Sequence, residues 1–293
     1  MLTRKSALLG AAIMVSPLAG ADVINVGGVL WDPDSPLDMT MDSSFTQWFQ
    51  STNSGYDMGS LVGINATNAT TMMFGNYLYG GGKINNFNDA NDQTGQPNPE
   101  TNPADFCPGC ELTYEFGGIE FVENTPGGGD FLDPSTYTVD WSQSYFKIWV
   151  DDSRNFNANN DFETNPNEMY DATDGNLFLE GSFESVSFTG QIFAAGMLFS
   201  NAGSAMHVTG GLAQDYFDTD PFVTLGGTPF DFSYTASSQF MVDLAGGGDV
   251  FFARASTAEL QGDTISIPEP GALALLGAGL IGLARVRRRH DAA

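Results

Sequence analysis

The chain has 293 residues, of which 36 are acidic and 10 are basic, so its formal net charge at pH 7 is −26. Such a surface repels the phosphates of nucleic acids and anionic lipids, and we expect no nucleic-acid partner. A net charge this far from zero keeps a protein soluble and also attracts divalent cations.

The first 21 residues are organised like a secretory signal peptide. Arg4 and Lys5 precede an apolar stretch at residues 7–15, and small residues follow at Ala19 and Ala21. A charged start, a short apolar centre and small residues at the cleavage site characterise such peptides. We therefore predict cleavage after Ala21 and an exported domain spanning residues 22–265.

The exported part is predicted to be all-β. Apolar and polar side chains alternate at residues 111–116, 145–150 and 186–192, which is the period of a β-strand. Segments rich in Gly or Asn are predicted to be loops between antiparallel strands, at residues 80–82, 125–130, 155–174, 226–227 and 246–248. We expect an antiparallel β-sandwich, with a jelly-roll-like arrangement or a barrel as the alternative.

Two segments in the N-terminal half depart from this strand pattern. Residues 42–49 place Phe45, Trp48 and Phe49 on one side of a helix, so we predict one short capped helix there. Residues 85–105 are polar, contain prolines and lack periodicity, which predicts a mobile loop.

Cys107 and Cys110 are the only cysteines of the chain and enclose Pro108 and Gly109. A Cys-x-x-Cys pair can be redox-active, but here the chain is exported and the pair precedes a strand rather than a helix. Two cysteines are too few for a structural zinc site without other ligands. We favour a structural disulfide across the turn, with a redox-active pair or a free dithiol as alternatives.

Oxygen-bearing side chains are densest at residues 151–163. Calcium prefers six to eight oxygen ligands from a flexible loop. The alternating Asn and acidic residues resemble an EF-hand loop, but the required Gly is missing, Pro166 stands where the last Glu should be, and a strand precedes the segment. We therefore expect either a solvated acidic loop or a β-loop calcium site formed by Asp151, Asp152, Asp161 and Glu163.

Catalytic motifs are scarce. The exported part has one histidine, His207, and no Gly-x-Ser-x-Gly motif, so neither a catalytic triad nor a His-based zinc site is favoured. We expect His207 to be an ordinary strand residue. The many acidic residues leave a carboxylate pair of the glycoside-hydrolase type open. The expectation is nevertheless that the protein is not an enzyme.

The end of the chain has three consecutive parts. They are the tripeptide Pro268, Glu269, Pro270, an uncharged run at residues 271–284, and the cluster Arg285, Arg287, Arg288, Arg289. The run is short for a membrane span, which needs about 20 residues, and the arginines favour a cytoplasmic end. The prolines mark the outer boundary of the helix. A short transmembrane helix is predicted.

This order at the end of an exported chain resembles the PEP-CTERM sorting signal, here at residues 266–290. The resemblance implies that Pro268, Glu269 and Pro270 are recognised by exosortase, a protease of the inner membrane, while the arginines retain the tail. It also implies transient anchoring and then delivery to the cell surface or extracellular matrix of a Gram-negative bacterium.

Other stretches resemble the flocculation-associated PEP-CTERM proteins, at residues 27–36, 105–118, 147–152, 174–179 and 210–213. This resemblance implies a non-enzymatic protein that promotes bacterial aggregation, or flocculation, as in biofilms. Its partners would be exopolysaccharide or a neighbouring cell surface, with calcium as a possible bridge. A secreted carbohydrate-binding module and a polysaccharide hydrolase remain as alternatives.

Overall fold

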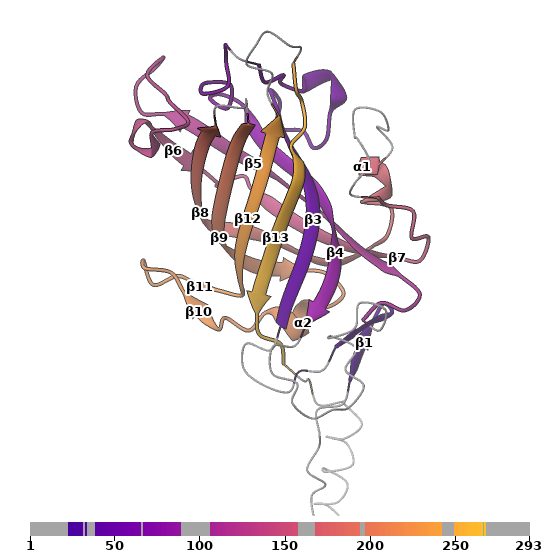
Figure 1. Cartoon of the computed structure of the whole chain (residues 1–293). Coiled ribbons are helices and arrows are strands. Elements are labelled where there is room, and N and C mark those ends of the chain that lie inside the picture. Colours follow the sequence, from indigo (N-terminus) through magenta and orange to yellow (C-terminus); the bar gives the residue numbers. More distant parts are fainter. Residues whose placement is uncertain are drawn as a thin grey trace, which may run out of the picture.

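The computed structural model describes residues 23–31, 33, 39–65, 67–88, 106–157, 168–193, 197–241, 249–265 and 267. Within these residues the chain is built almost entirely of antiparallel strands (Figure 1). Eight long strands form the body: β3 (Met39–Gln50), β4 (Tyr77–Asn88), β5 (Glu111–Glu123), β7 (Tyr145–Asp151), β8 (Asn176–Phe193), β9 (Met197–Gly210), β12 (Phe232–Met241) and β13 (Arg254–Gly262).

The shorter elements lie around this body. The short strands are β1 (Ile24–Val26), β2 (Val29–Trp31), β6 (Tyr137–Asp140), β10 (Phe222–Val223) and β11 (Pro229–Phe230). The helices are η1 (Met58–Ser60), η2 (Pro134–Thr136), α1 (Glu168–Asp171) and α2 (Gln214–Phe217). None of the helices that the structure describes has the length and apolarity needed to cross a membrane.

The long strands close into a barrel. Their order is β4-β3-β13-β12-β9-β8-β7-β5. The last strand of this order, β5, also pairs with the first, β4, so the sheet closes on itself. Strand β6 pairs with the far end of β5. The predicted all-β antiparallel fold is confirmed, and the closure matches the barrel alternative. The strands predicted at residues 111–116, 145–150 and 186–192 lie in β5, β7 and β8.

Aromatic side chains fill the inside of the barrel. Phe116 packs against Phe45, Phe183 and Tyr234, with ring centroids 5.9–6.5 Å apart. A barrel of eight strands is just wide enough for side chains to fill. Two interior cavities measure about 20 Å³ each, which is room for roughly one water molecule apiece.

The prediction of a loop at residues 80–82 is wrong, because these glycines lie in the middle of β4. A Cβ atom on Gly80 would overlap the ring of Phe116, and one on Gly82 would lie 2.6 Å from Cβ of Phe45. Gly80 and Gly82 are therefore needed for space, since they make room for large rings inside the barrel. Composition alone suggested a loop because glycine is usually read as a turn residue.

The prediction of a helix at residues 42–49 is also wrong, because the segment belongs to β3. Phe45 and Phe49 are four residues apart, a spacing that fits one face of a strand as well as one face of a helix. Both belong to the barrel core, whereas Trp48 points the other way and packs against Tyr79 and Phe252 outside it. The segment forms a strand because it hydrogen-bonds to β4 along one edge and to β13 along the other.

Candidate functional site

A polar groove runs over the outer face of neighbouring strands that include β3, β13, β12 and β9. Its volume is about 530 Å³. It is lined by Asp42, Ser43, Asn85, Asn201, Thr235, Ala236, Ser237, Thr257, Ala258 and Glu259. Because successive side chains of a strand point to opposite faces, Thr257 and Glu259 are exposed in the groove while Leu260 is buried in the barrel.

The register aligns the groove's side chains in two rows across the strands. In one row, Asp42 is opposite Glu259, and Glu259 is opposite Thr235. In the other, Thr257 is opposite Ser237, and Ser237 is opposite Asn201. Carboxylate, hydroxyl and amide groups are thus presented together on one rigid surface.

The groove can make hydrogen bonds, but the part of its lining that the structure describes contains no aromatic side chain on which a sugar ring could stack. The hydroxyls of Ser237 and Thr257 are 3.3 Å apart, and the Asn85 amide donates to the Ser44 hydroxyl over 3.1 Å. These groups can donate and accept hydrogen bonds with an extended hydroxyl-rich ligand.

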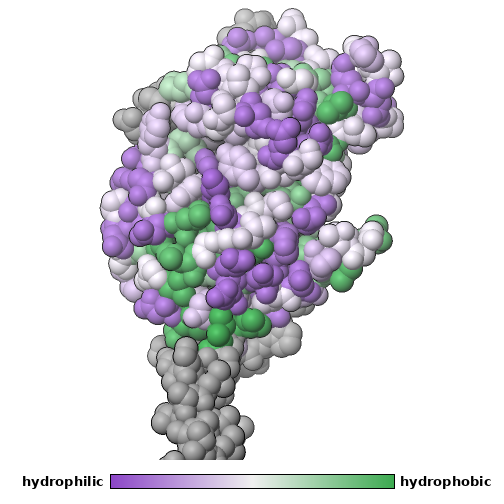
Figure 2. Space-filling model, turned by 180° about the vertical axis from the view of Figure 1, so that it is seen from behind, coloured by the Kyte–Doolittle hydropathy of each residue, from purple (hydrophilic) through white to green (hydrophobic). Residues whose placement is uncertain are grey.

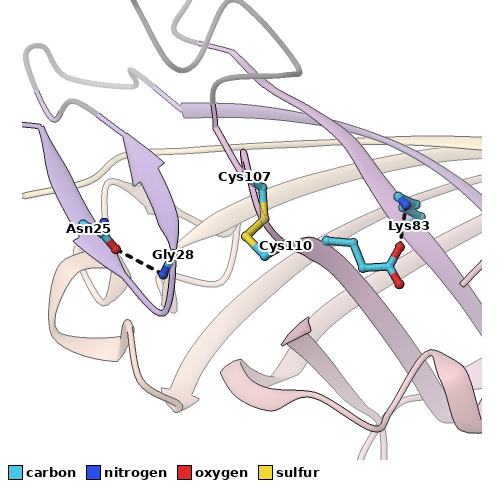
Figure 3. The surroundings of a disulfide bond; sticks show 6 residues. Asn25, Gly28, Lys83, Cys107 and Cys110 are labelled. Atoms are coloured by element: carbon cyan, nitrogen blue, oxygen red, sulfur yellow. Dashed lines mark hydrogen bonds and ion pairs between the residues drawn. A yellow bond between two sulfur atoms is a disulfide. The ribbon is translucent and has the colours of Figure 1, made fainter. Parts of the chain in front are cut away.

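The two cysteines form a disulfide next to the β1–β2 hairpin (Figure 3). Both are buried, and the N–H of Cys110 donates to the carbonyl of Cys107 over 3.3 Å. Gly28 of the hairpin turn faces the bond, since a Cβ there would lie 3.5 Å from the Cys110 sulfur. The pair closes a tight turn at the entry to β5, which is a structural position.

An ion pair between a buried carboxylate and a partly exposed lysine follows the disulfide, and it was not foreseen from the sequence. Glu111 is buried, and its Oε2 lies 2.5 Å from Nζ of Lys83 (Figure 3). Its other oxygen accepts a hydrogen bond from the N–H of Phe156 over 2.9 Å. The pair joins β4, β5 and the segment after β7, so this carboxylate has a structural partner on each oxygen.

The calcium prediction is only partly covered by the described residues. Asp151 ends β7 and Asp152 follows it, whereas Asp161 and Glu163 lie outside the described residues. Among the residues that are described, Asp151 and Asp152 belong to no group of three or more ligand side chains close enough to share an ion. The calcium loop therefore stays a prediction.

Acidic groups do crowd this part of the molecule. Desolvation raises the pKa of Asp171 in α1, and the charges of Glu168, Asp174, Glu111 and Asp151 raise it further. The crowding explains why the region looks attractive to a cation, although it does not supply a ligand geometry by itself.

His207 lies in β9, as expected, but it has neighbours that the sequence did not reveal. Its Nδ1 is 3.1 Å from Oδ2 of Asp231 and 3.8 Å from Oδ1 of Asp220. Asp231 precedes β12 and is fully buried, while Asp220 lies in the loop after α2. The signal available in the sequence was the acidic segment at residues 215–220, but only the pairing of β9 with β12 brings it to the histidine.

The predicted export and sorting residues lie outside the described part of the chain. This applies to the signal-peptide residues Ala19 and Ala21, and to Pro268, Glu269, Pro270, Arg285, Arg287, Arg288 and Arg289. The body that precedes the tail is an all-β protein with an acidic composition. A family model for the PEP-CTERM protein-sorting motif matches residues 266–289.

The chain therefore carries a PEP-CTERM sorting motif at residues 266–289, and this motif implies an exported protein that is anchored transiently in the membrane before exosortase processes it. The family match covers the tail and does not extend into the barrel. No curated protein and no solved structure gave a significant match to the chain.

Proposed function

We propose that this protein is a non-enzymatic component of the Gram-negative cell surface or extracellular matrix that promotes aggregation of cells with exopolysaccharide. The polar groove is proposed as the surface that contacts the polysaccharide. The observation that carries this proposal is the alignment of the two rows of carboxylate, hydroxyl and amide side chains across the outer strands. The sorting motif supports it, because such a motif implies an exported protein.

The shape of the groove suits a long polymer better than a small substrate. It lies on the outside of the barrel, and strands β3, β13, β12 and β9 provide a rigid base for it. The two interior cavities each have room for about one water molecule and are too small for a sugar ring. An extended ligand lying across the strands could meet several residues of both rows at once.

A hydrolase is the second candidate, because Asp42 and Glu259 stand directly opposite each other in the groove. Glycosidases use two carboxylates on either side of the scissile bond. Both side chains are exposed, whereas the acid of such a pair usually has its pKa raised by burial. Incubating the purified exported protein with the host's exopolysaccharide separates the two candidates. A hydrolase would release new reducing ends, and Glu259→Gln would abolish their release, whereas an adhesive protein would release none.

The test is a gene deletion in the native host, complemented with wild type or with groove variants. The double variant Thr257→Val, Ser237→Ala removes two groove hydroxyls but preserves strand-compatible side chains. Thr138→Val in β6 is the matched control, because Thr138 is an exposed strand threonine outside the groove lining. We expect the double variant to be exported normally but to restore floc settling poorly, and the control to restore it fully.

Two further readouts complete this test. Total exopolysaccharide should be equal in all strains, because the protein is proposed to link the polymer and not to make it. A purified protein that binds the polysaccharide while the deletion leaves flocs unchanged would indicate a carbohydrate-binding module without a role in aggregation. Full restoration of floc settling by the double variant would contradict the proposal that the groove contacts the polysaccharide.

The sorting step has its own test, which does not depend on the groove. Replacing Glu269 by Gln, or deleting residues 285–289, should leave the tail attached to the chain. Mass spectrometry of the cell-associated and released protein measures the C-terminus directly. Unchanged processing in both variants would contradict the assigned roles of these residues.

A further inference from the structure

We propose that His207, Asp220 and Asp231 form a binding site for a divalent transition-metal ion of the Zn²⁺ type. The site is independent of the polar groove and of the proposed role in aggregation. One ligand atom from each residue lies within 4.8 Å of the other two. The three residues come from β9, from the loop after α2 and from the position just before β12, so the folded barrel alone assembles them.

The distances between the ligand atoms fit one small ion. In a tetrahedral zinc site with bonds of about 2.0–2.1 Å, two ligand atoms are roughly 3.3 Å apart. Nδ1 of His207 is 3.1 Å from Oδ2 of Asp231 and 3.8 Å from Oδ1 of Asp220. The two spacings bracket this value, so the side chains already stand close to the separation that an ion requires.

The ring nitrogen provides an independent indication. Nδ1 of His207 is shielded from solvent and makes no hydrogen bond of acceptable direction, although Oδ2 of Asp231 is only 3.1 Å away. In a hydrogen bond the oxygen lies nearly on the axis of the N–H. Around a metal the ion takes that axis and the oxygens lie to its side, which is the arrangement expected from the missing hydrogen bond.

The backbone holds the Asp231 carboxylate in place. Its Oδ1 accepts hydrogen bonds from the N–H groups of Thr219 and Asp220, both over 2.8 Å. Its Oδ2 accepts one from Val208 over 2.8 Å and faces His207. Hydrogen bonds of this kind orient ligating carboxylates in metal sites. The same contacts place Asp220 beside the histidine.

The donor set selects the class of ion. One imidazole nitrogen and two carboxylate oxygens suit zinc or a similar transition metal, whereas calcium prefers oxygen alone. The side chains of His207 and Asp220 are 34% and 45% exposed, so an ion can enter from solvent and keep water at its remaining position. The site can therefore load after export.

Binding would fasten a protruding part of the molecule. The strands β10 and β11 follow Asp220 directly and form a hairpin that stands out from the body (Figures 1 and 2). Val223 and Leu225 of this hairpin are strongly exposed. An ion that joins Asp220 to β9 and β12 would fix the base of the hairpin to the barrel.

The test uses the exported protein purified from the host, treated with a chelator and then titrated with Zn²⁺ by calorimetry. We expect one saturable zinc site per chain. His207→Gln and Asp220→Asn should each weaken it at least about tenfold, consistent with the loss of a ligand. These two positions are partly exposed and are chosen over the buried Asp231, whose replacement could unfold the protein.

Asp133→Asn is the matched control, because it removes one exposed negative charge outside both candidate metal sites, keeps a side chain that can cap η2, and should leave zinc affinity unchanged. Circular dichroism checks that all variants keep the fold. The proposal is overturned if no saturable zinc site is found, or if His207→Gln binds zinc as tightly as wild type. Tighter binding of Ca²⁺ than of Zn²⁺ at these residues would overturn the assignment to transition metals.

Discussion

The inner and outer faces of the same strands follow different rules in this barrel. On the inner face of β12, Phe232, Tyr234 and Phe240 are buried among other aromatic rings, whereas Thr235 and Ser237 on its outer face line the polar groove. The inner face is constrained by volume, because side chains from all eight long strands share one enclosed space. The side chains of the outer face are not fixed by packing and can contact a ligand. We therefore expect substitutions on the inner face to affect stability and substitutions on the outer face to affect binding.

The largest expected effect is on the inner face. Phe116→Ala would remove a buried ring that contacts Phe45, Phe183 and Tyr234. We expect a loss of about 3–5 kcal/mol in the free energy of unfolding, because the barrel cannot collapse around the cavity. Urea denaturation of the purified exported protein measures it.

Thr235→Ala is the outer-face counterpart of this substitution. It should change the free energy of unfolding by about 0.5 kcal/mol or less, as is usual for an exposed position. Equal losses of unfolding free energy in Phe116→Ala and Thr235→Ala would contradict the expectation that the inner face determines stability and the outer face does not.

An intermediate effect is expected at the glycines of β4. Gly80→Ala places a methyl group against the Phe116 ring, so we expect a destabilisation of about 1–3 kcal/mol from overpacking. Gly109→Ala is the control, since nothing lies within 4 Å of a Cβ at that position. The urea midpoints of the two variants show whether a side chain at Gly80 is excluded by steric overlap or whether any loss of glycine flexibility is destabilising. Similar midpoints for the two variants would argue against steric overlap.

The smallest effect concerns Glu115, an outer-face residue of β5 that neighbours partly cover. Desolvation raises its pKa above the ordinary value of 4.5, while Lys147 and Tyr145 lower it less strongly. Because the folded-state pKa of this acid is raised, its ionisation costs stability as pH rises through that pKa. Glu115→Gln should therefore be slightly more stable than wild type at pH 7, and the difference should shrink below pH 4.5.

Thermal unfolding measured across this pH range tests the Glu115 prediction. Lys147→Met should act in the opposite direction at pH 7, because it removes the charge that favours the ionised carboxyl. A stability difference between Glu115→Gln and wild type that does not vary with pH would contradict the role of burial.

Much of the architecture could be predicted from local patterns. Alternation at residues 111–116 and 145–150 correctly predicted β5 and β7, because a strand with one enclosed face shows period two directly. The same reasoning failed for β3, where apolar residues four apart fit a strand and a helix equally well. It failed again at Gly80, where the need for glycine comes from a ring on another strand.

Some of the candidate sites could also be predicted from local sequence, and others could not. The sorting motif at residues 266–289 is a continuous stretch that a processing enzyme reads in sequence order, so the residues alone revealed it. The disulfide also joins cysteines close in the chain. The groove and the His207 cluster could not be predicted, since each depends on the register of strands far apart in sequence.

The sequence by itself determined that this protein is exported, sorted through its tail and built from antiparallel strands. These features rest on local periodicity and on contiguous motifs. Only the tertiary structure decided that the sheet closes on itself, that Asp42 meets Glu259, and that His207 meets Asp231. The physical reason is that strand order and register arise from packing one shared core, and no short stretch of the chain contains that information.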